Sequence, residues 1–190
     1  MSAPSLPAPQ CVLSQNILPA PTCQNEPVVE TTTQVLSVID IPGLGGKVRR
    51  ATVANTTVPA NNDSALDTRA NPGSGIVHPN GATVYYLDLA PRSSTPMHRT
   101  VSVDYLVVLD GSPTLVTPMG DFSVVDGEAK YTETVDTVIP RGSTVVQRGQ
   151  LHAWQNRTDE WVRMVVVVVD AEPQFVEADG MRLELGEIWL

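Results

Sequence analysis

Apolar and polar residues alternate with a period of two along most of this chain, and residues that favour turns separate the alternating segments. Asp110-Gly111 and Asp126-Gly127 are typical hairpin turns. The run at 161–170 is apolar at almost every position, which is typical of a strand covered on both faces in the middle of a sheet. The strands predicted before this run lie at 81–90, 95–111, 114–127, 130–140 and 143–149.

No segment has the pattern of an amphipathic helix of useful length, and no internal repeat is visible. The tail after residue 180 is compatible with a last strand or a short helix. The pattern as a whole predicts an all-β sandwich or barrel of antiparallel strands.

The N-terminal part differs from this core. Residues 1–26 contain five prolines and no acidic or basic residue before Glu26, which predicts an arm or a disordered tail. Val-rich runs in 27–60 predict one or two further strands, and 61–75 predicts a loop. We therefore expect an arm over residues 1–30, partly disordered or packed on a partner subunit, and one barrel domain over 31–190.

Charge and composition exclude several classes of function. The formal net charge is −9 and there is no basic run, so binding to nucleic acid or to an anionic lipid surface is not expected. The longest apolar run, 164–169, is too short to span a bilayer. The N-terminus does not resemble a secretory signal, which favours a cytoplasmic protein with Cys11 and Cys23 as free thiols.

The segment 95–111 carries an unusual row of polar residues. Alternation places His98, Thr100, Ser102 and Asp104 on one face of the strand, followed by Leu106. Each of these polar groups would need a partner if it were buried. The row therefore indicates either a functional pocket or a face exposed to solvent.

The segment PMHRTVSVDYLVVLDG resembles the first motif of the cupin superfamily. His98 matches the first histidine of that motif, and Thr100 stands at the position of the second. Asp104 occupies the position of the motif's glutamate, and Gly111 matches its closing glycine.

A second segment, QRGQLHAWQN, resembles the second cupin motif. Gly149, His152 and Asn156 match it, whereas Gln147 replaces a proline. The resemblance covers about residues 80–172 and extends to a group of cupins from fungal natural-product gene clusters. It implies a double-stranded β-helix, or jelly-roll barrel, with a small-molecule site between its sheets.

The resemblance also implies a metal site formed by His98, Asp104 and His152. Two imidazoles and one carboxylate with open positions suit Fe(II), and the same set would suit Zn(II) as a Lewis acid. Thr100 is not a strong ligand, although its hydroxyl could hold a metal-bound water. The alternative is a metal-free pocket in which the same residues act as acid and base.

Other residues are candidates for contact with a substrate. Trp154 shares the face of His152, and Gln147, Gln150 and Asn156 could orient a substrate or satisfy backbone groups. His78 is a further imidazole that could reach the pocket or lie in a loop. The predicted substrate contacts are Thr100, Ser102, Tyr105, Gln147 and Trp154.

Three arginines are open to two interpretations. Arg99, Arg148 and Arg163 could hold an anionic substrate or form surface ion pairs. Trp161 and Trp189 are expected in the core or at an interface.

The function predicted from these features is that of a tailoring enzyme of secondary metabolism acting on a polyketide-like or other cyclic substrate. The expected reaction is a metal-assisted decarboxylation, dehydration or isomerisation. The alternatives are an Fe(II)-dependent dioxygenase and a cupin that binds a small ligand without turnover. The unbroken apolar run 165–169 and the apolar arm also predict a homodimer through sheet edges.

Overall fold

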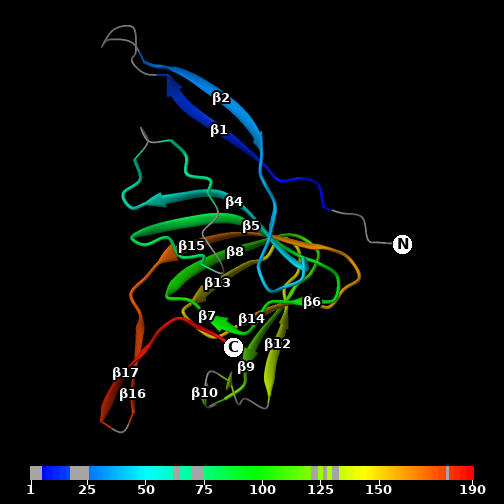
Figure 1. Cartoon of the computed structure of the whole chain (residues 1–190), viewed down its shortest axis with the longest axis vertical. Coiled ribbons are helices and arrows are strands. Elements are labelled where there is room, and N and C mark those ends of the chain that lie inside the picture. Colours follow the sequence, from blue (N-terminus) through cyan, green and yellow to red (C-terminus); the bar gives the residue numbers. More distant parts are fainter. Residues whose placement is uncertain are drawn as a thin grey trace.

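The computed structural model describes residues 6–17, 26–61, 65–69, 75–120, 124–125, 128–129, 133–178 and 180–190. These residues form strands and loops and no helix, which confirms the all-β prediction (Figure 1). Within the same ranges no helix is long and apolar enough to cross a bilayer.

The strands are β1 (Gln10–Ile17), β2 (Val28–Val35), β3 (Ile39–Asp40), β4 (Val48–Thr57), β5 (Gly81–Leu89), β6 (Ser93–Ser94), β7 (His98–Arg99), β8 (Ser102–Asp110), β9 (Thr114–Pro118), β10 (Val124–Val125), β11 (Glu128–Ala129), β12 (Thr134–Val138), β13 (Thr144–Arg148), β14 (Ala153–Asn156), β15 (Val162–Asp170), β16 (Gln174–Ala178), β17 (Met181–Leu185) and β18 (Ile188–Trp189). Parts of the predicted strands 114–127 and 130–140 lie outside the described residues.

Two antiparallel sheets form the barrel. One has six strands in the order β13-β8-β15-β5-β4-β3, and the other has four in the order β12-β9-β14-β6. The main apolar cluster lies between them, because Trp154 of β14 packs with residues of the larger sheet such as Leu106 and Val166. This double-sheet jelly roll confirms the predicted fold class.

The apolar strand β15 lies between β8 and β5, as its pattern predicted. Val166 and Val168 point into the barrel and are buried. Val165, Val167 and Val169 lie on the other face and are half-buried. A strand in the middle of a sheet forms ladders on both sides, which explains why so few of its positions are polar.

The segment predicted as one strand over 95–111 is interrupted. Thr100 and Val101 leave the ladder, so His98 belongs to β7 and Asp104 to β8. The turn after β8 requires Gly111, because its φ is +73° and a Cβ there would lie 2.7 Å from Cγ2 of Val162.

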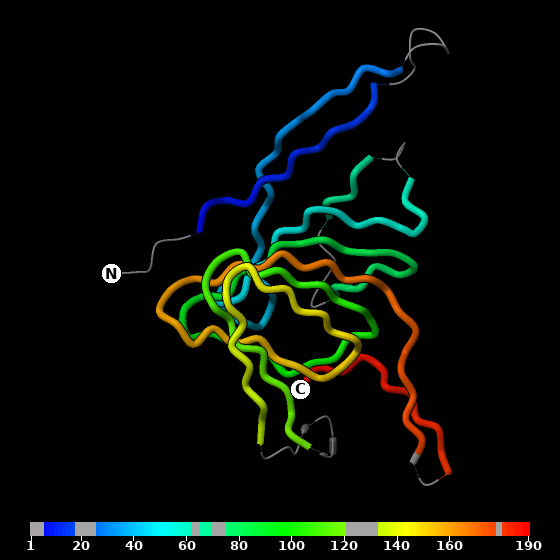
Figure 2. The backbone as a smooth tube through the Cα atoms, turned by 180° about the vertical axis from the view of Figure 1, so that it is seen from behind, coloured from blue at the N-terminus to red at the C-terminus, as the bar shows by residue number. Residues whose placement is uncertain are grey.

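The described part of the N-terminal arm contains a strand. β1 pairs with β2 in a hairpin that projects from the barrel and spans the predicted boundary at residue 30 (Figure 2). Leu36 N donates to Pro9 O at 2.8 Å and closes the base of the hairpin, and Arg163 Nη1 of β15 joins the segment before β1 to the barrel by donating to Pro7 O at 2.7 Å. Cys11 on β1 is a free thiol, and Cys23 lies outside the described residues.

The C-terminal tail consists of strands, which decides between the two alternatives left open by the sequence. β16 and β17 form a second projecting hairpin (Figures 1 and 2). The chain then returns to the barrel, where β18 pairs with β7 through Ile188↔Arg99 and Trp189↔His98. This pairing brings the end of the chain to the residues of the first motif.

Candidate active site

A cavity between the two sheets holds the residues with the most reactive side chains. A water-sized sphere can occupy about 100 Å³ of it, and it opens to solvent at its mouth. Most of its walls are apolar or aromatic. The polar or titratable side chains that line it are Arg50, Tyr85, Thr95, His98, Asp104, Gln147 and His152.

His98 and His152 form a pair on one side of this cavity. Their backbones exchange two hydrogen bonds of 2.8 and 2.9 Å, and their ring centroids are 4.3 Å apart. Nδ1 of His98 lies 2.9 Å from Pro96 O, and Nδ1 of His152 lies 3.1 Å from Gln150 O. A carbonyl only accepts, so each Nδ1 carries the proton and each neutral ring keeps its lone pair on Nε2.

Both imidazoles are neutral at physiological pH. Burial, together with a smaller effect of the neighbouring His98, lowers the pKa of His152 to about 3. Burial also lowers the pKa of His98, although the carbonyl of Pro96 opposes this effect. The pair can therefore accept hydrogen bonds or bind a Lewis acid without first losing a proton.

Asp104 enters the cavity from β8 and is only 4% exposed. Burial raises the pKa of its carboxyl group to about 6, and the hydroxyl of Ser102 partly offsets this shift by donating to Oδ1 at 2.7 Å. Ser102 has one proton, so the 2.7 Å contact with Thr100 must be donated by Thr100. A carboxyl group with this pKa can take up or release a proton near neutral pH.

Thr100 and Ser102, two of the predicted substrate contacts, lie next to Asp104 but outside the lining of this cavity. Both side chains are buried, and they support Asp104. Ser102 shares the buried face of Asp104 on β8, but it lies at the start of that strand, where its hydroxyl bonds to Thr100 and Asp104.

The predicted metal ligands line one cavity but do not form a metal site. Among the described residues, no three His, Cys, Asp or Glu side chains are placed to hold one ion. The donor set His98, Asp104 and His152 therefore does not fit a three-ligand metal centre in this arrangement.

Two further predicted contacts lie in the cavity and one does not. Trp154 and Gln147 both line it, and each is 2% exposed. Tyr105 does not line this cavity: it is 46% exposed on the outer face of β8. Alternation explains this outcome, because Tyr105 follows the inward-pointing Asp104.

Arg50 and Trp189 line the cavity although the sequence did not point to either as a site residue. Arg50 is buried there, with its guanidinium 5.6 Å from the ring centroid of Tyr85. Trp189 stacks on His98, with ring centroids 4.3 Å apart and ring planes 1° from parallel. No local signal could have identified Trp189, because its position depends on the long-range pairing of β18 with β7.

The other predicted candidates lie elsewhere. Arg163 forms a buried ion pair with Asp88, with two contacts of 2.7 Å, and Arg99 donates to Gly186 O. Neither of these arginines lines the cavity, nor do Arg148 and His78.

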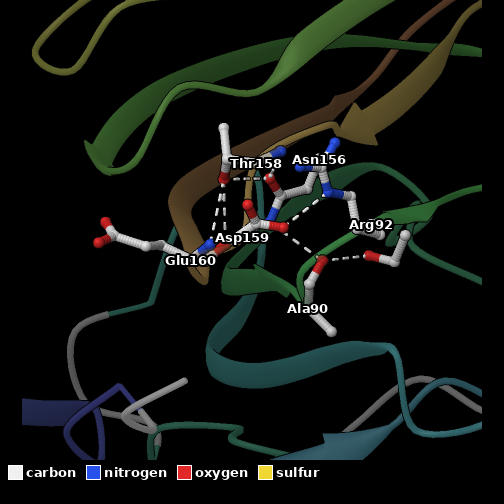
Figure 3. Close-up of polar contacts among 7 residues, drawn as sticks. Ala90, Arg92, Asn156, Thr158, Asp159 and Glu160 are labelled. Atoms are coloured by element: carbon white, nitrogen blue, oxygen red, sulfur yellow. Dashed lines mark hydrogen bonds and ion pairs between the residues drawn. The ribbon is translucent and has the colours of Figure 1, made fainter. Parts of the chain in front are cut away.

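Asn156, which matches the second motif, has a structural role. Its Nδ2 donates to the carbonyl oxygens of Ala90 and Glu160 at 3.0 and 2.7 Å (Figure 3) and to that of Leu89 at 3.1 Å. Its Oδ1 accepts from the backbone N and the hydroxyl of Thr158. The amide therefore holds the turn after β14 against the end of β5 and does not face a ligand.

These features define the class of protein: a cupin barrel with a partly polar cavity at the residues of both motifs. Comparison with known proteins agrees. No family model matches the chain. The chain is 34% identical over 158 residues to phomopsin biosynthesis cluster protein D of Diaporthe leptostromiformis, which covers 80% of this chain and 75% of that protein.

Two further similarities are weaker. The cupin-domain-containing oxidoreductase fogC of Aspergillus ruber is 27% identical over 136 residues, which is 70% of this chain and 60% of that protein. A solved protein with a double-stranded β-helix domain from Klebsiella pneumoniae superposes with a TM-score of 0.44 at 15% identity, over 76% of this chain and 89% of its own. The chain belongs to the cupin superfamily, in the family of fungal biosynthesis-cluster proteins that includes phomopsin cluster protein D.

Proposed function

We propose that this protein is an enzyme of fungal secondary metabolism that carries out acid–base chemistry on a small cyclic substrate in its barrel cavity. One observation carries the proposal: Asp104, His98 and His152 line the same largely apolar cavity and have pKa values displaced by burial. The relationship to a biosynthesis-cluster protein supports the metabolic context.

Each group has a distinct part in this proposal. Asp104 is the proton carrier, because its pKa of about 6 allows both protonation states near neutral pH. The hydroxyl of Ser102 fixes the orientation of the carboxyl group. His98 and His152 accept hydrogen bonds at Nε2 and orient the substrate. Such a set suits a decarboxylation, a dehydration or an isomerisation, in which a proton is moved and no oxidant is consumed.

Divalent metal binding, with Fe(II) or Zn(II) as the candidates, stays a prediction, and no step of this proposal depends on it. Metal analysis of the purified protein tests it directly. A stoichiometric metal that is lost in His98→Ala would show that the imidazole pair provides ligands.

An oxidative reaction is the second candidate, because a relative is named a cupin-domain-containing oxidoreductase. Ligand binding without turnover is the third. Oxygen consumption separates the first two candidates. An oxidase or dioxygenase requires O₂, whereas the proposed reaction proceeds under argon and gives a product of the same composition or one that lacks CO₂ or water.

The deciding experiment uses metabolite extracts from a fungal strain in which the gene is deleted. Purified protein is added, and the loss of accumulated compounds is followed by mass spectrometry. We expect Asp104→Asn and His152→Ala to lower the rate roughly 100-fold, the scale of losing a general acid or base. Asp110→Asn is the matched control, because it makes the same change at an exposed position of the same strand. Normal turnover by both cavity variants would contradict the proposal.

The predicted homodimer also remains a proposal. The β1–β2 hairpin exposes a set of apolar side chains that a partner could cover, namely Val12, Ile17, Val28, Val29 and Val35. A hairpin of two strands is marginally stable by itself, which favours such a contact. Light scattering that gives a particle of one chain at micromolar concentration would rule it out.

A further inference from the structure

Gln147 lines the cavity and has a hydrogen-bond donor without a partner. The residue lies on β13, is 2% exposed and lines the cavity wall. Its Nε2 is fully buried, and none of the described residues accepts a hydrogen bond from it. A buried amide without a partner is unfavourable and uncommon in folded proteins, and an occupant with an acceptor atom would relieve the cost.

The neighbour of Gln147 limits the kind of acceptor. Gln147 is the register partner of Asp104 on β8, and side chains directly opposite each other on one face of a sheet are adjacent. An anionic group bonded to Nε2 would lie beside the Asp104 carboxylate and be repelled by it. A neutral carbonyl oxygen also accepts from Nε2 and carries no net charge for Asp104 to repel.

The remaining walls limit the shape of the occupant. Tyr85, Trp154 and Trp189 line the same cavity, together with aliphatic side chains such as Leu106 and Val166. Aromatic walls favour a flat ring, because offset or edge-on contact with ring faces adds to the burial of apolar surface.

We propose that Gln147 is a substrate-binding residue whose Nε2 donates to a neutral carbonyl oxygen of a planar, largely apolar compound, and that this oxygen is placed beside Asp104. The inference rests on the proposed function, since it names the substrate class of the same cavity. It also accounts for an amide at the position where the second motif has a proline.

A matched pair of probes tests this subsite without knowledge of the natural substrate. Acetophenone and α-methylstyrene have nearly the same shape, but only acetophenone has a carbonyl oxygen. We expect acetophenone to bind roughly fivefold or more tightly in a ligand-observed NMR titration, the scale of one net hydrogen bond. It should also shift the side-chain amide signal of Gln147, which is assigned by its absence in Gln147→Met.

Variants decide whether the preference comes from this amide. Gln147→Met should bind both probes equally, whereas Gln155→Met, a change on β14 outside the cavity, should keep the preference for acetophenone. Equal binding of the two probes to the wild type would overturn the proposal. A preference that survives Gln147→Met, or no binding of either probe at its solubility limit, would also overturn it.

Thermal unfolding without ligand gives an independent test. A donor without a partner loses nothing when it becomes a thioether of similar size, so Gln147→Met should melt at the same temperature as the wild type or higher. A melting temperature lower by several degrees would show that the amide has a structural partner. These binding and melting measurements involve no turnover. The proposal for Gln147 can therefore fail while Asp104→Asn still lowers activity, and the proposed function can fail while Gln147 still binds the carbonyl probe.

Discussion

Asn156 and Gln147 are two buried primary amides of the same barrel with opposite surroundings. The amide of Asn156 is 0% exposed, donates to three carbonyl oxygens and accepts from Thr158 (Figure 3). The amide of Gln147 is almost as buried, yet its Nε2 has no partner among the described residues. Both belong to the segments that resemble the second motif, so the motif contains one structural residue and one that is available to a ligand.

The polar groups around Asn156 are also bonded to one another, whereas those of the cavity that Gln147 lines are not all satisfied. The turn at 156–160 satisfies its polar groups internally, which stabilises the fold. The cavity instead contains a carboxyl group and two imidazoles whose pKa values are displaced mainly by burial. Titratable groups that are buried with displaced pKa values reduce the stability of the fold and are typical of functional sites. The comparison predicts that substitutions at the turn lower stability, whereas substitutions in the cavity change function and can raise stability.

The largest effect is expected for Asn156→Leu. The substitution removes the donor for three carbonyl groups and the acceptor for Thr158, in a place that solvent does not reach. We expect a loss of about 3–5 kcal/mol in the free energy of unfolding, or failure to fold. Urea denaturation measures the change, and a loss below about 1 kcal/mol would remove the contrast between the two amides.

Asp104→Asn should stabilise the protein, but only at higher pH. Because the folded-state pKa of about 6 is above the ordinary value of 3.8, the folded protein holds this proton more tightly than the unfolded chain. Stability is therefore lost as pH rises from about 4 to 6, and the amide avoids this loss. We expect a gain of about 2–3 kcal/mol at pH 7.5 and none at pH 3.5. Denaturation at the two pH values measures it, and a gain independent of pH would contradict the assignment to burial of the carboxylate.

Trp189→Ala tests the contribution of the C-terminal strand to the cavity. The indole stacks on His98, and its Nε1 donates to Glu187 Oε1 at 2.6 Å. Loss of the stack should cost about 1 kcal/mol. The same change opens the wall beside His98, so binding of planar probes should weaken in the NMR titration. Unchanged probe binding would place Trp189 outside the functional part of the cavity.

The smallest effect is expected at the surface of the Asn156 turn. Arg92 Nε lies 2.8 Å from Asp159 Oδ1, and both side chains are largely exposed (Figure 3). Exposed ion pairs are screened by solvent and lose side-chain entropy, so Arg92→Ala should not change the urea midpoint measurably. Arg92 has a φ of +54°, and alanine shares that backbone cost, so the variant isolates the ion pair. A clear shift would mean that the turn depends on this pair as well as on Asn156.

The sequence by itself determined the features that depend on local periodicity. Alternation on β8 predicted that Asp104 shares a face with His98, and the apolar run of β15 predicted a central strand. The glycine of the predicted Asp110-Gly111 turn has a φ of +73°, which glycine adopts readily. These features were predictable because the period of a strand and the geometry of a turn are properties of the backbone over a few residues.

Only the tertiary structure decided which polar groups face the cavity and which are already bonded. Thr100 and Ser102 bond to each other and to Asp104 outside the cavity lining, and pairing of strands distant in sequence brought Arg50 and Trp189 to it. The sequence could not distinguish Asn156 from Gln147, because whether a buried amide finds partners depends on carbonyl groups contributed by other strands and turns. Hydrogen-bond satisfaction is set by distances of about 3 Å between segments far apart in the chain, and only the assembled barrel fixes those distances.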